Sequence, residues 1–524
     1  MSKCLTILEV SQKQNYIFAS NKVKNNIVNS AVIAYVLSAE YIGEILSETT
    51  YQEEKNMVYS GGGHTILEFP DQNTAKEMVA VITKKIYCEF DGLMVFAKTE
   101  IFDEGIKMKQ CLECLIKALE IKKSVRLCSF HHGSYGIEKI DSNTLDVVAK
   151  NGISAAKNKV EKKEYNSTAK KYTPEGYDPV YQFDELGGSK NDTNFIAVVH
   201  IDGNGMGKRV EELYDQIDKE NQSWDETKKS LKKFSEGIDK DFKSAYRDMT
   251  EVVAKNLKES ELESKLSLKK CKFPVRRIIT AGDDICFVTE GRIGIECARI
   301  FMEELSKKKN DIDKKKYSAC AGVAIVHQKY PFYRAYELAE MLCSNAKRYG
   351  AQISPEDNGR SISAIDWHIE FGELKDSLDE IRKSYMTLDN NRLEMRPYIV
   401  EAPDNIMNNE QYIAKKYSNF KKIINRIQHG EETYGNGKVK ELRSALKQGE
   451  TATRNYLCFN HMEDIIVENR PREDKIKEED LKKLFSGKYG MGMAFILQPD
   501  DKKHSILYDS IELMDSFIAL KGGE

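Results

Sequence analysis

The sequence predicts an α+β protein made of two similar units of β-α-β-β-α-β order, followed by a helical segment. Short apolar runs rich in β-forming residues alternate with stretches whose apolar residues recur at helical spacing. This order occurs twice, over residues 1–148 and 191–370, which indicates an internal duplication. The remaining residues, 371–524, show a charged helical pattern, with one hairpin expected at Met491–Leu497.

Length and composition limit the classes of function. A chain of 524 residues is too long for one ordinary core, so several domains are expected. The net charge of -3 gives no overall positive field for nucleic acid. No apolar run approaches the ~20 residues of a membrane span, and the N-terminus lacks a signal-peptide pattern. The 11 cysteines are scattered as reduced thiols would be, so we expect a cytoplasmic protein.

The first unit follows the chain in order. The expected elements are a strand at Cys4–Val10, a short segment at Gln14–Phe18, a helix at 25–46, two strands within 56–69, a helix from Asp71 to Ile86, a strand at Leu93–Phe102 and a helix at 107–122. The two central strands surround a glycine turn, Gly61–Gly63. Residues 149–190 are polar and lysine-rich, which is typical of a linker or a small insertion.

The second unit repeats this order. The expected elements are a strand at Phe195–Ile201, a helical insertion at about 209–269, a hairpin of Val275–Thr280 and Ile285–Thr289, a helix at Ile293–Lys308, a strand at Ser318–His327 and a helix at Phe332–Arg348. Pro331 stands where a proline opens a helix.

Three carboxylates occupy the strand ends of the second unit. Asp283 and Asp284 lie at the tip of the predicted hairpin, and Asp202 ends the first strand, where ligands of α/β sheets usually lie. Adjacent carboxylates repel each other unless a hard divalent cation lies between them. If the strands are neighbours, the three side chains could hold one or two Mg2+ or Mn2+ ions, an arrangement that suits nucleotidyl transfer.

A glycine-rich loop follows Asp202. Its residues are Gly203, Asn204, Gly205, Met206, Gly207 and Lys208. The glycines would let backbone N–H groups approach phosphates, and a helix begins just after them. The spacing matches neither a Walker loop nor a dinucleotide fingerprint, so a plain strand-to-helix turn capped by Asp202 stays open as the alternative.

Two further features have a functional and a purely structural interpretation. Lys347 closes its predicted helix, where a lysine commonly serves the helix dipole but could also contact phosphates. Gly61, Gly62 and Gly63 stand in the first unit where Ala281–Asp284 stand in the second. No carboxylate accompanies them, so this turn could line a second nucleotide pocket or be only a hairpin turn.

One group of cysteines and histidines raises the question of a zinc site. Its candidate ligands are Cys111, Cys114, Cys128, His131 and His132. Structural zinc sites usually show two ligand pairs with clear loop spacing, and this set does not, so free thiols are favoured.

These motifs resemble the polymerase/cyclase large subunit of type III CRISPR effectors and, more distantly, GGDEF-type nucleotide cyclases. The resemblance rests on the Asp202–Gly207 loop, the Ala281–Asp284 turn and Tyr330–Ala339, with Gln14–Phe18 and Gly61–Gly63 in the first unit. It implies two palm domains of ferredoxin-like fold and a helical C-terminal domain. It also implies ATP as substrate, two metal ions held by Asp202, Asp283 and Asp284, and Lys347 as a triphosphate contact. Gly282 would belong to the nucleotide-binding turn.

The sequence departs from the family pattern in three ways. Ala281 replaces a glycine and Asn204 replaces a second loop carboxylate, while the usual nuclease domain and four-cysteine zinc module are absent. We therefore expect a short stand-alone relative.

The expected function is a nucleotidyltransferase that joins nucleoside triphosphates into a cyclic nucleotide or cyclic oligonucleotide and releases pyrophosphate, in antiviral defence. Expected partners are nucleoside triphosphates, ATP preferred, a downstream effector of the product, and an RNA or phage-derived regulator. We expect no membrane association and either a monomer or a homodimer. Two alternatives stay open: a catalytically silent nucleotide sensor or scaffold subunit, and a diguanylate-cyclase-like enzyme that uses GTP.

Overall fold

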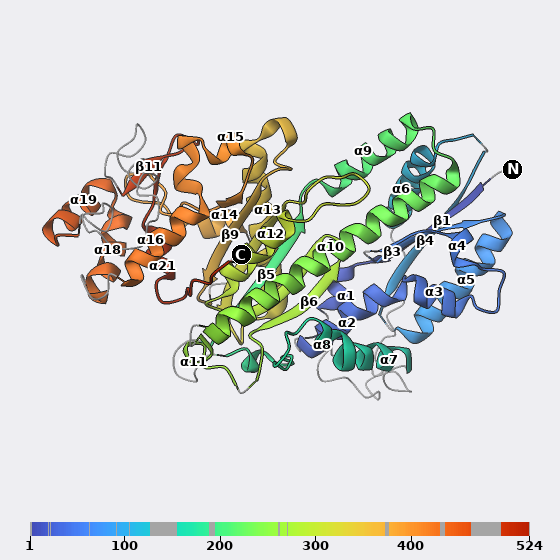
Figure 1. Ribbon diagram of the computed structural model, residues 1–524, viewed down its shortest axis with the longest axis horizontal. Helices are drawn as coiled ribbons and strands as arrows, with labels where there is room; N and C mark the ends of the chain where they lie inside the picture. Colours follow the sequence, from blue (N-terminus) through green and yellow to red (C-terminus); the bar gives the residue numbers. More distant parts are fainter. Residues whose placement is uncertain are drawn as a thin grey trace.

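The protein is described by a computed structural model. It describes residues 3–18, 20, 23–61, 63–90, 92–103, 105–125, 155–187, 194–259, 262–269, 271–372, 377–429, 435–462 and 494–522. Figure 1 shows the first unit in blue at one end, the C-terminal helices in orange and red at the other, and the second unit between them. Within these ranges, no helix is both long and apolar enough to cross a membrane.

The first unit contains a four-stranded sheet in the order β2-β3-β1-β4. Its elements are β1 (Lys3–Ser11), α1 (Lys13–Ile17), α2 (Val23–Val36), α3 (Ala39–Ile45), α4 (Glu53–Asn56), β2 (Met57–Gly61), β3 (His64–Phe69), α5 (Gln72–Glu89), β4 (Met94–Phe102) and α6 (Met108–Ser124). As predicted, Asp71 caps α5, accepting hydrogen bonds from the backbone of Asn73 and Thr74. The single helix expected at 25–46 is two helices, because Ser38 caps a new one at α3.

The second unit repeats this topology. Its elements are β5 (Phe195–Gly203), α9 (Met206–Lys219), α10 (Trp224–Glu259), α11 (Leu262–Lys265), β6 (Val275–Ala281), β7 (Asp284–Glu290), α12 (Gly294–Ser306), β8 (Ala319–His327), α13 (Phe332–Ile353) and β9 (Ser363–Glu370). Strands β8-β5-β7-β6 lie in the same order as β4-β1-β3-β2, with the first strand antiparallel to both neighbours. The prediction of two β-α-β-β-α-β units is confirmed.

The second sheet is wider than predicted, because β9 pairs with β8 and β10 (Tyr398–Glu401) pairs with β9. Strand β9 was not predicted because Asp366, His368 and Glu370 interrupt its apolar pattern. All three are buried, and Asp366 accepts hydrogen bonds from Arg382 (2.6 Å) and Asn345 (2.7 Å). Because the polar residues of β9 are buried with partners, the strand lies in the core although its sequence is not a continuous apolar run.

The C-terminal segment is mainly helical, as expected, with short strands. Its remaining elements are α14 (Leu378–Lys383), α15 (Asp404–Met407), a 3-10 helix η4 (Glu410–Lys415), α16 (Tyr417–His429), α18 (Asn436–Gln448), α19 (Glu450–Phe459), β11 (Phe495–Leu497), β12 (Lys503–Ser505) and α21 (Tyr508–Leu513). The expected hairpin at Met491–Leu497 is only partly described, and β11 pairs with β12 beyond it.

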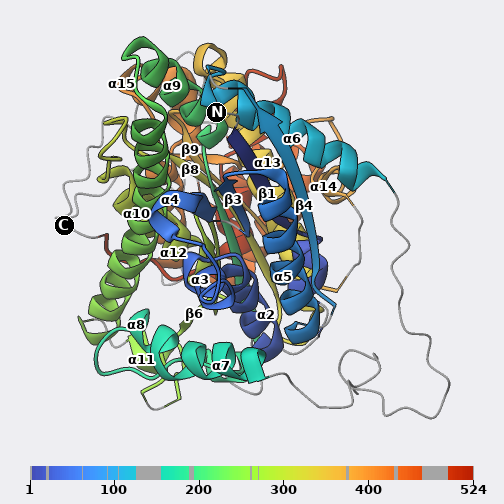
Figure 2. The ribbon, with the colours of Figure 1, turned by 90° about the vertical axis from the view of Figure 1, so that its right-hand side faces the viewer.

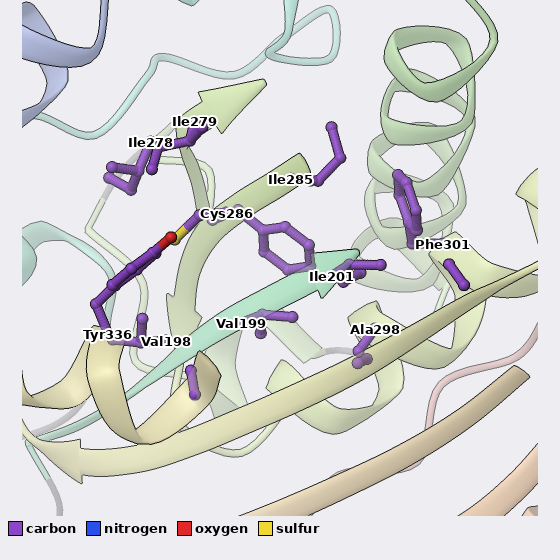
Figure 3. Close-up of a cluster of buried hydrophobic side chains, with 14 of the residues drawn as sticks. Val198, Val199, Ile201, Ile278, Ile279, Ile285, Cys286, Ala298, Phe301 and Tyr336 are labelled. Atoms are coloured by element: carbon purple, nitrogen blue, oxygen red, sulfur yellow. The ribbon is translucent and has the colours of Figure 1, made fainter. Parts of the chain in front are cut away.

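Helices cover both faces of the second sheet. Side chains alternate along each strand, so Ile201 packs toward Phe301 and Ala298 of α12, while Val198 and Cys286 face Tyr336 of α13 (Figure 3). Helix α13 lies very close to β8 because Gly322 has no side chain. A Cβ there would stand 2.0 Å from the carbonyl oxygen of Ala339.

The two units contact each other reciprocally. Helix α10 packs along β2 of the first unit, and the corresponding helix of that unit, α2, packs against β6 of the second. Trp224 and Lys228 at the start of α10 both donate hydrogen bonds to Glu68 of β3, each at 2.9 Å. Burial raises the pKa of Tyr59 in β2, and the charge of Asp283 adds to this shift, so the β2–β3 hairpin lies near the β6–β7 turn.

The segment between the units is folded rather than a plain linker. It contains α7 (Ala155–Lys163), a π-helix η1 (Glu164–Thr168), α8 (Ala169–Lys171) and a 3-10 helix η2 (Phe183–Glu185). Figure 2 shows α7 running along one edge beside α2. The buried Glu164 accepts two hydrogen bonds from Arg277 (2.9 and 2.8 Å) and one from Arg276 (3.3 Å), which ties this segment to β6.

Candidate active site

Pairing of β5 with β7 brings two of the predicted carboxylates together. Asp202 and Asp284 are register partners on these antiparallel strands. Because directly opposed residues point to the same face of a sheet, the two side chains share the face that α13 covers. The sequence predicted that these side chains lie together only if the two strands were neighbours, and the structure shows that they are.

Asp283 lies in the tight turn before Asp284. Ala281 pairs with Asp284, so Gly282 and Asp283 form a two-residue hairpin turn. Gly282 has φ of 65°, a left-handed value that such turns require and that glycine adopts without strain. No atom lies within 4 Å of the position of a Cβ at Gly282, so the turn is open on that side.

Lys347 reaches this edge of the sheet from α13. Its Nζ lies 2.6 Å from Oδ2 of Asp202 and donates a second hydrogen bond to the carbonyl of Gly203 at 2.9 Å. Burial alone would lower the pKa of Lys347, but the adjacent Asp202 carboxylate outweighs it and raises the pKa. Lys347 therefore remains a cation beside the carboxylates.

The position of Lys347 within its helix differs from the prediction. Helix α13 continues to Ile353, so Lys347 is not in the last turn and does not serve the helix terminus. Gly350, three residues after Lys347, packs against Ile362, the residue before β9. A Cβ on Gly350 would stand 3.4 Å from Cβ of Ile362. The interpretation as a dipole partner is wrong, and the contact with Asp202 replaces it.

The glycine-rich loop is shaped by close packing. A Cβ at Gly203 would stand 3.0 Å from Cβ of Asp283 and 3.1 Å from the ring of Phe242. Gly205 has φ of 64° and is the N-cap residue of α9, with the side chain of Arg360 packed against it. The loop thus sets a helix N-terminus beside the carboxylates, as the sequence predicts.

Two predicted loop contacts have other partners. The buried Asn204 donates from its amide to the carbonyl of Ile362 (2.6 Å) and to Ser318 (3.2 Å), so its amide ties β5 to β8 and β9. Lys208 is exposed and pairs with Glu211 at 2.9 Å. Met206 is half-buried and Gly207 is exposed in the first turn of α9. The side chains of Asn204 and Lys208 therefore have partners other than the carboxylates of the site.

The first unit presents its glycine turn to the same region. Gly61 lies against Tyr59, and a Cβ on it would stand 3.7 Å from Oγ of Ser235 on α10. Gly63 has φ of 77°, and Lys13 lies against it. Gly62 lies outside the described residues.

Topology identifies the counterpart of the carboxylate site in the first unit. Glu9 pairs with His64 as Asp202 pairs with Asp284. Lys123 lies 2.8 Å from Glu9, as Lys347 lies 2.6 Å from Asp202. Each lysine stands 15 residues after the first residue of its helix, α6 or α13. The duplication therefore extends to one lysine–carboxylate pair, while His64 replaces the second carboxylate.

Contacts between the units close one side of the site. Gln14 of α1 donates to Glu340 of α13 at 3.0 Å, and Phe18 packs against Tyr336 with ring centroids 4.6 Å apart. The positive charge of Lys13 lies close enough to favour the ionised form of Asp284. The first unit thus contributes a cation to the surroundings of the second unit's carboxylates.

The carboxylates of the turn are held in an environment that opposes their ionisation. Burial raises the pKa of Asp283 to about 6 and that of Asp284 to about 7, and the charge of Asp202 adds to both shifts. The Asp284 side chain is 40% exposed as a whole, but its Oδ1 atom is buried and has no hydrogen-bond partner among the described residues. A bound cation would favour the ionised forms of both aspartates.

The donor set fits a hard divalent cation in its chemistry. Asp202 and Asp284 are paired carboxylates, and Asp283 is their neighbour on the turn. Over the described ranges, however, no three Asp, Glu, His or Cys side chains are grouped closely enough to enclose an ion, and Asp202 is turned to Lys347.

Of the zinc candidates, Cys128, His131 and His132 lie outside the described residues.

The pH dependence of stability tests this electrostatic account. Both folded-state pKa values exceed the ordinary 3.8, so the folded state binds protons more tightly than the unfolded state. Stability from this source is therefore lost as pH rises from about 4 through about 7. In EDTA, the melting temperature of wild type should fall relative to that of Asp283→Asn/Asp284→Asn between pH 5 and 8, and Mn2+ should reverse the fall. A difference that stays constant with pH would contradict it.

One residue of the site was not predicted from the sequence. His200 lies two residues before Asp202, on the same face of β5, and its Nδ1 lies 3.5 Å from Oδ1 of Asp284. Burial lowers its pKa, so the imidazole is neutral. A polar residue at a two-residue interval from Asp202, inside an otherwise apolar strand, was the signal available in the sequence.

One family model and several solved structures are similar to this chain. Residues 195–353 match the family model described as Cas10/Cmr2, second palm domain. The crystal structure of Csm1 in T. onnurineus is similar, with a TM-score of 0.52 and 14% identity over 98% of this chain and 70% of that chain. None of the curated proteins that were compared matches.

Weaker similarities were found to Csm1–Csm4 cassettes. The apo cassette gives a TM-score of 0.44 and 16% identity over 70% of this chain, and the cassette in complex with AMPPNP gives 0.43 and 17% over 69%. In both, the chain spans 54% of the length of its match. On the family match and the shared fold, the chain resembles the Cas10 large subunit of type III CRISPR effectors, and its second unit corresponds to the second palm domain.

Proposed function

We propose that this protein is a metal-dependent nucleotidyltransferase that converts ATP, or other nucleoside triphosphates, into a cyclic nucleotide or cyclic oligonucleotide. The observation that carries the proposal is the pairing of Asp202 with Asp284 on neighbouring strands, beside Asp283 and under Lys347. This combination of carboxylates and a cation suits a site that must hold both metal and triphosphate.

Each residue of the candidate site would have its own role in the reaction. Asp202, Asp283 and Asp284 would hold Mg2+ or Mn2+, which supplies charge neutralisation at the attacking hydroxyl and the leaving pyrophosphate. With Asp202 holding the ion, Lys347, which contacts Asp202 in this structure, would be free to contact the triphosphate. The open turn at Gly282 leaves room for phosphate oxygens beside the backbone.

The reaction is a displacement at the α-phosphorus of one nucleotide. A ribose hydroxyl oxygen of the acceptor forms the new P–O bond, the bond between the α-phosphorus and the bridging oxygen to the β-phosphorus breaks, and pyrophosphate leaves. The hydroxyl proton passes to solvent. A second, ring-closing displacement of the same kind gives the cyclic product.

The first palm would hold the acceptor nucleotide. Gly61 and Gly63 add no side chains of their own to its turn, and Lys13, which lies against Gly63, would supply positive charge there. This palm lacks the paired carboxylates, since His64 stands opposite Glu9, so it would bind a nucleotide without catalysing.

The rival proposal is a catalytically silent nucleotide sensor or scaffold subunit of a CRISPR-like complex. The observation in its favour is the commitment of the Asn204 amide to Ile362 and Ser318, which leaves the loop one carboxylate short of the family pattern. Such a protein would bind nucleotide and release no pyrophosphate.

The test is to incubate purified protein with each nucleoside triphosphate, singly and mixed, with Mg2+ or Mn2+, and to identify products by mass spectrometry. A cyclic product with stoichiometric pyrophosphate supports the synthase and names its base, which separates ATP from GTP use. Nucleotide binding by thermal shift, without pyrophosphate in either metal, supports the sensor.

The cellular setting is proposed on the same grounds. We infer antiviral signalling, with a downstream effector that binds the product and an RNA or phage-derived regulator. The described cysteines all carry free thiols, which suits the cytoplasm. Because both palms belong to one chain and contact each other, a monomer would bring both turns to one site, and a homodimer is also compatible.

A further inference from the structure

A buried histidine stands directly behind one of the carboxylates of the site. The His200 side chain is 6% exposed, and its Nδ1 lies 3.5 Å from Oδ1 of Asp284. Among the described residues, neither of these two buried atoms has a hydrogen-bond partner. Unpaired buried polar atoms are costly, so two that face each other at this distance call for an explanation.

The surroundings of His200 fix its ring. Tyr336 of α13 packs edge-on against the imidazole, with ring centroids 5.5 Å apart and planes at 78°. On the adjacent strand, Cys286 is its register partner. The ring is therefore held by a strand on one side and a helix on the other, with Nδ1 toward Asp284.

The separation of 3.5 Å is slightly longer than an ordinary N–H···O hydrogen bond. Contacts in catalytic sites are often long without ligands and shorten when the site is loaded. Carboxylates that bind metals are themselves held by hydrogen bonds from a second layer of residues, and loss of such a partner commonly costs about 10–100-fold in metal affinity.

We propose that His200 is a positioning residue, which donates a hydrogen bond from Nδ1 to Oδ1 of Asp284 and orients the other carboxylate oxygen, Oδ2, toward a divalent cation. The inference rests on the proposed function, because it requires Asp284 to be a metal ligand. It adds a residue of the second palm that neither touches nucleotide nor binds metal, yet sets the metal affinity.

Two substitutions at His200 separate the hydrogen bond from the packing. His200→Phe keeps an aromatic ring against Tyr336 and removes the donor. His200→Asn places an amide nitrogen near the position of Nδ1 and loses the ring. A matched control is Val198→Ala, which loosens the same face of β5 beside Tyr336 (Figure 3). Val198 pairs with Val288, which lies four residues along β7 from Asp284.

The measurement is Mn2+ binding to the full chain, from the electron paramagnetic resonance signal of free Mn2+, together with the melting temperature of each variant. We expect His200→Phe to bind Mn2+ about 10-fold more weakly than wild type with little change in melting temperature. His200→Asn should recover most of the affinity despite a lower melting temperature, and Val198→Ala should lower only the melting temperature.

The outcomes are distinct. If His200→Phe binds Mn2+ with wild-type affinity, the proposed role of His200 is refuted. The same holds if all three variants lose affinity in proportion to the fall in their melting temperatures. Neither result contradicts the metal site itself. If wild type binds no Mn2+, or if Asp284→Ala binds it as well as wild type, the metal site itself is refuted and the inference falls with it.

Discussion

Replacing both Asp283 and Asp284 by alanine is expected to abolish product formation, with a loss of about three orders of magnitude or more. The physical reason is that these side chains supply most of the negative charge at the turn, so their removal leaves Asp202 as the single carboxylate at the strand ends. Product and pyrophosphate are measured in the same nucleotide incubation as for wild type.

The fold of this double variant should be intact. Burial and the negative charge of Asp202 raise the pKa values of both aspartates, so at pH 8 their ionised forms oppose folding, and alanine relieves this cost. Its melting temperature in EDTA should equal or exceed that of wild type. The matched control is Asp379→Ala/Glu380→Ala, an exposed acidic pair in α14, which should retain full activity. Undiminished turnover in a well-folded Asp283/Asp284 variant would refute the assignment.

Substituting Gly322 by valine is expected to destabilise the protein strongly. A Cβ at this position would meet the carbonyl oxygen of Ala339 at 2.0 Å and the backbone nitrogen of Cys343 at 2.4 Å. These are backbone atoms of α13 and cannot rotate away, so the helix must lift from β8. We expect a loss of at least about 3 kcal/mol in the free energy of unfolding, measured in urea.

The same variant should lose activity through Lys347. Lifting α13 carries this lysine away from Asp202, which lies next to β8 in the sheet. The matched control is Gly43→Ala in the interior of α3, where nothing lies within 4 Å of the new Cβ. There alanine should stabilise the protein by up to about 1 kcal/mol, because it is the better helix former. A Gly322→Val protein as stable as wild type would show that α13 is not seated as described.

Much of the fold follows from local patterns in the chain. The two β-α-β-β-α-β units, the Asp71 cap and the turn at Gly282 follow from apolar periodicity and turn chemistry, which act over a few residues. Strand β9 was missed for the opposite reason. Its buried Asp366 is satisfied by Arg382 and Asn345, partners that only the folded chain brings near.

In the candidate site, too, some features were predictable from the sequence and others depend on the tertiary structure. Asp202, Asp283 and Asp284 were recognisable from sequence, because carboxylates at the ends of apolar strands are a local signal. The contact of Lys347 with Asp202, the approach of Lys13 from the first palm and the position of His200 behind Asp284 depend on strand register and helix packing. The sequence therefore predicted which residue types and strand ends form the candidate site. Tertiary structure decided which of them meet, because pairing and close packing join residues far apart in the chain.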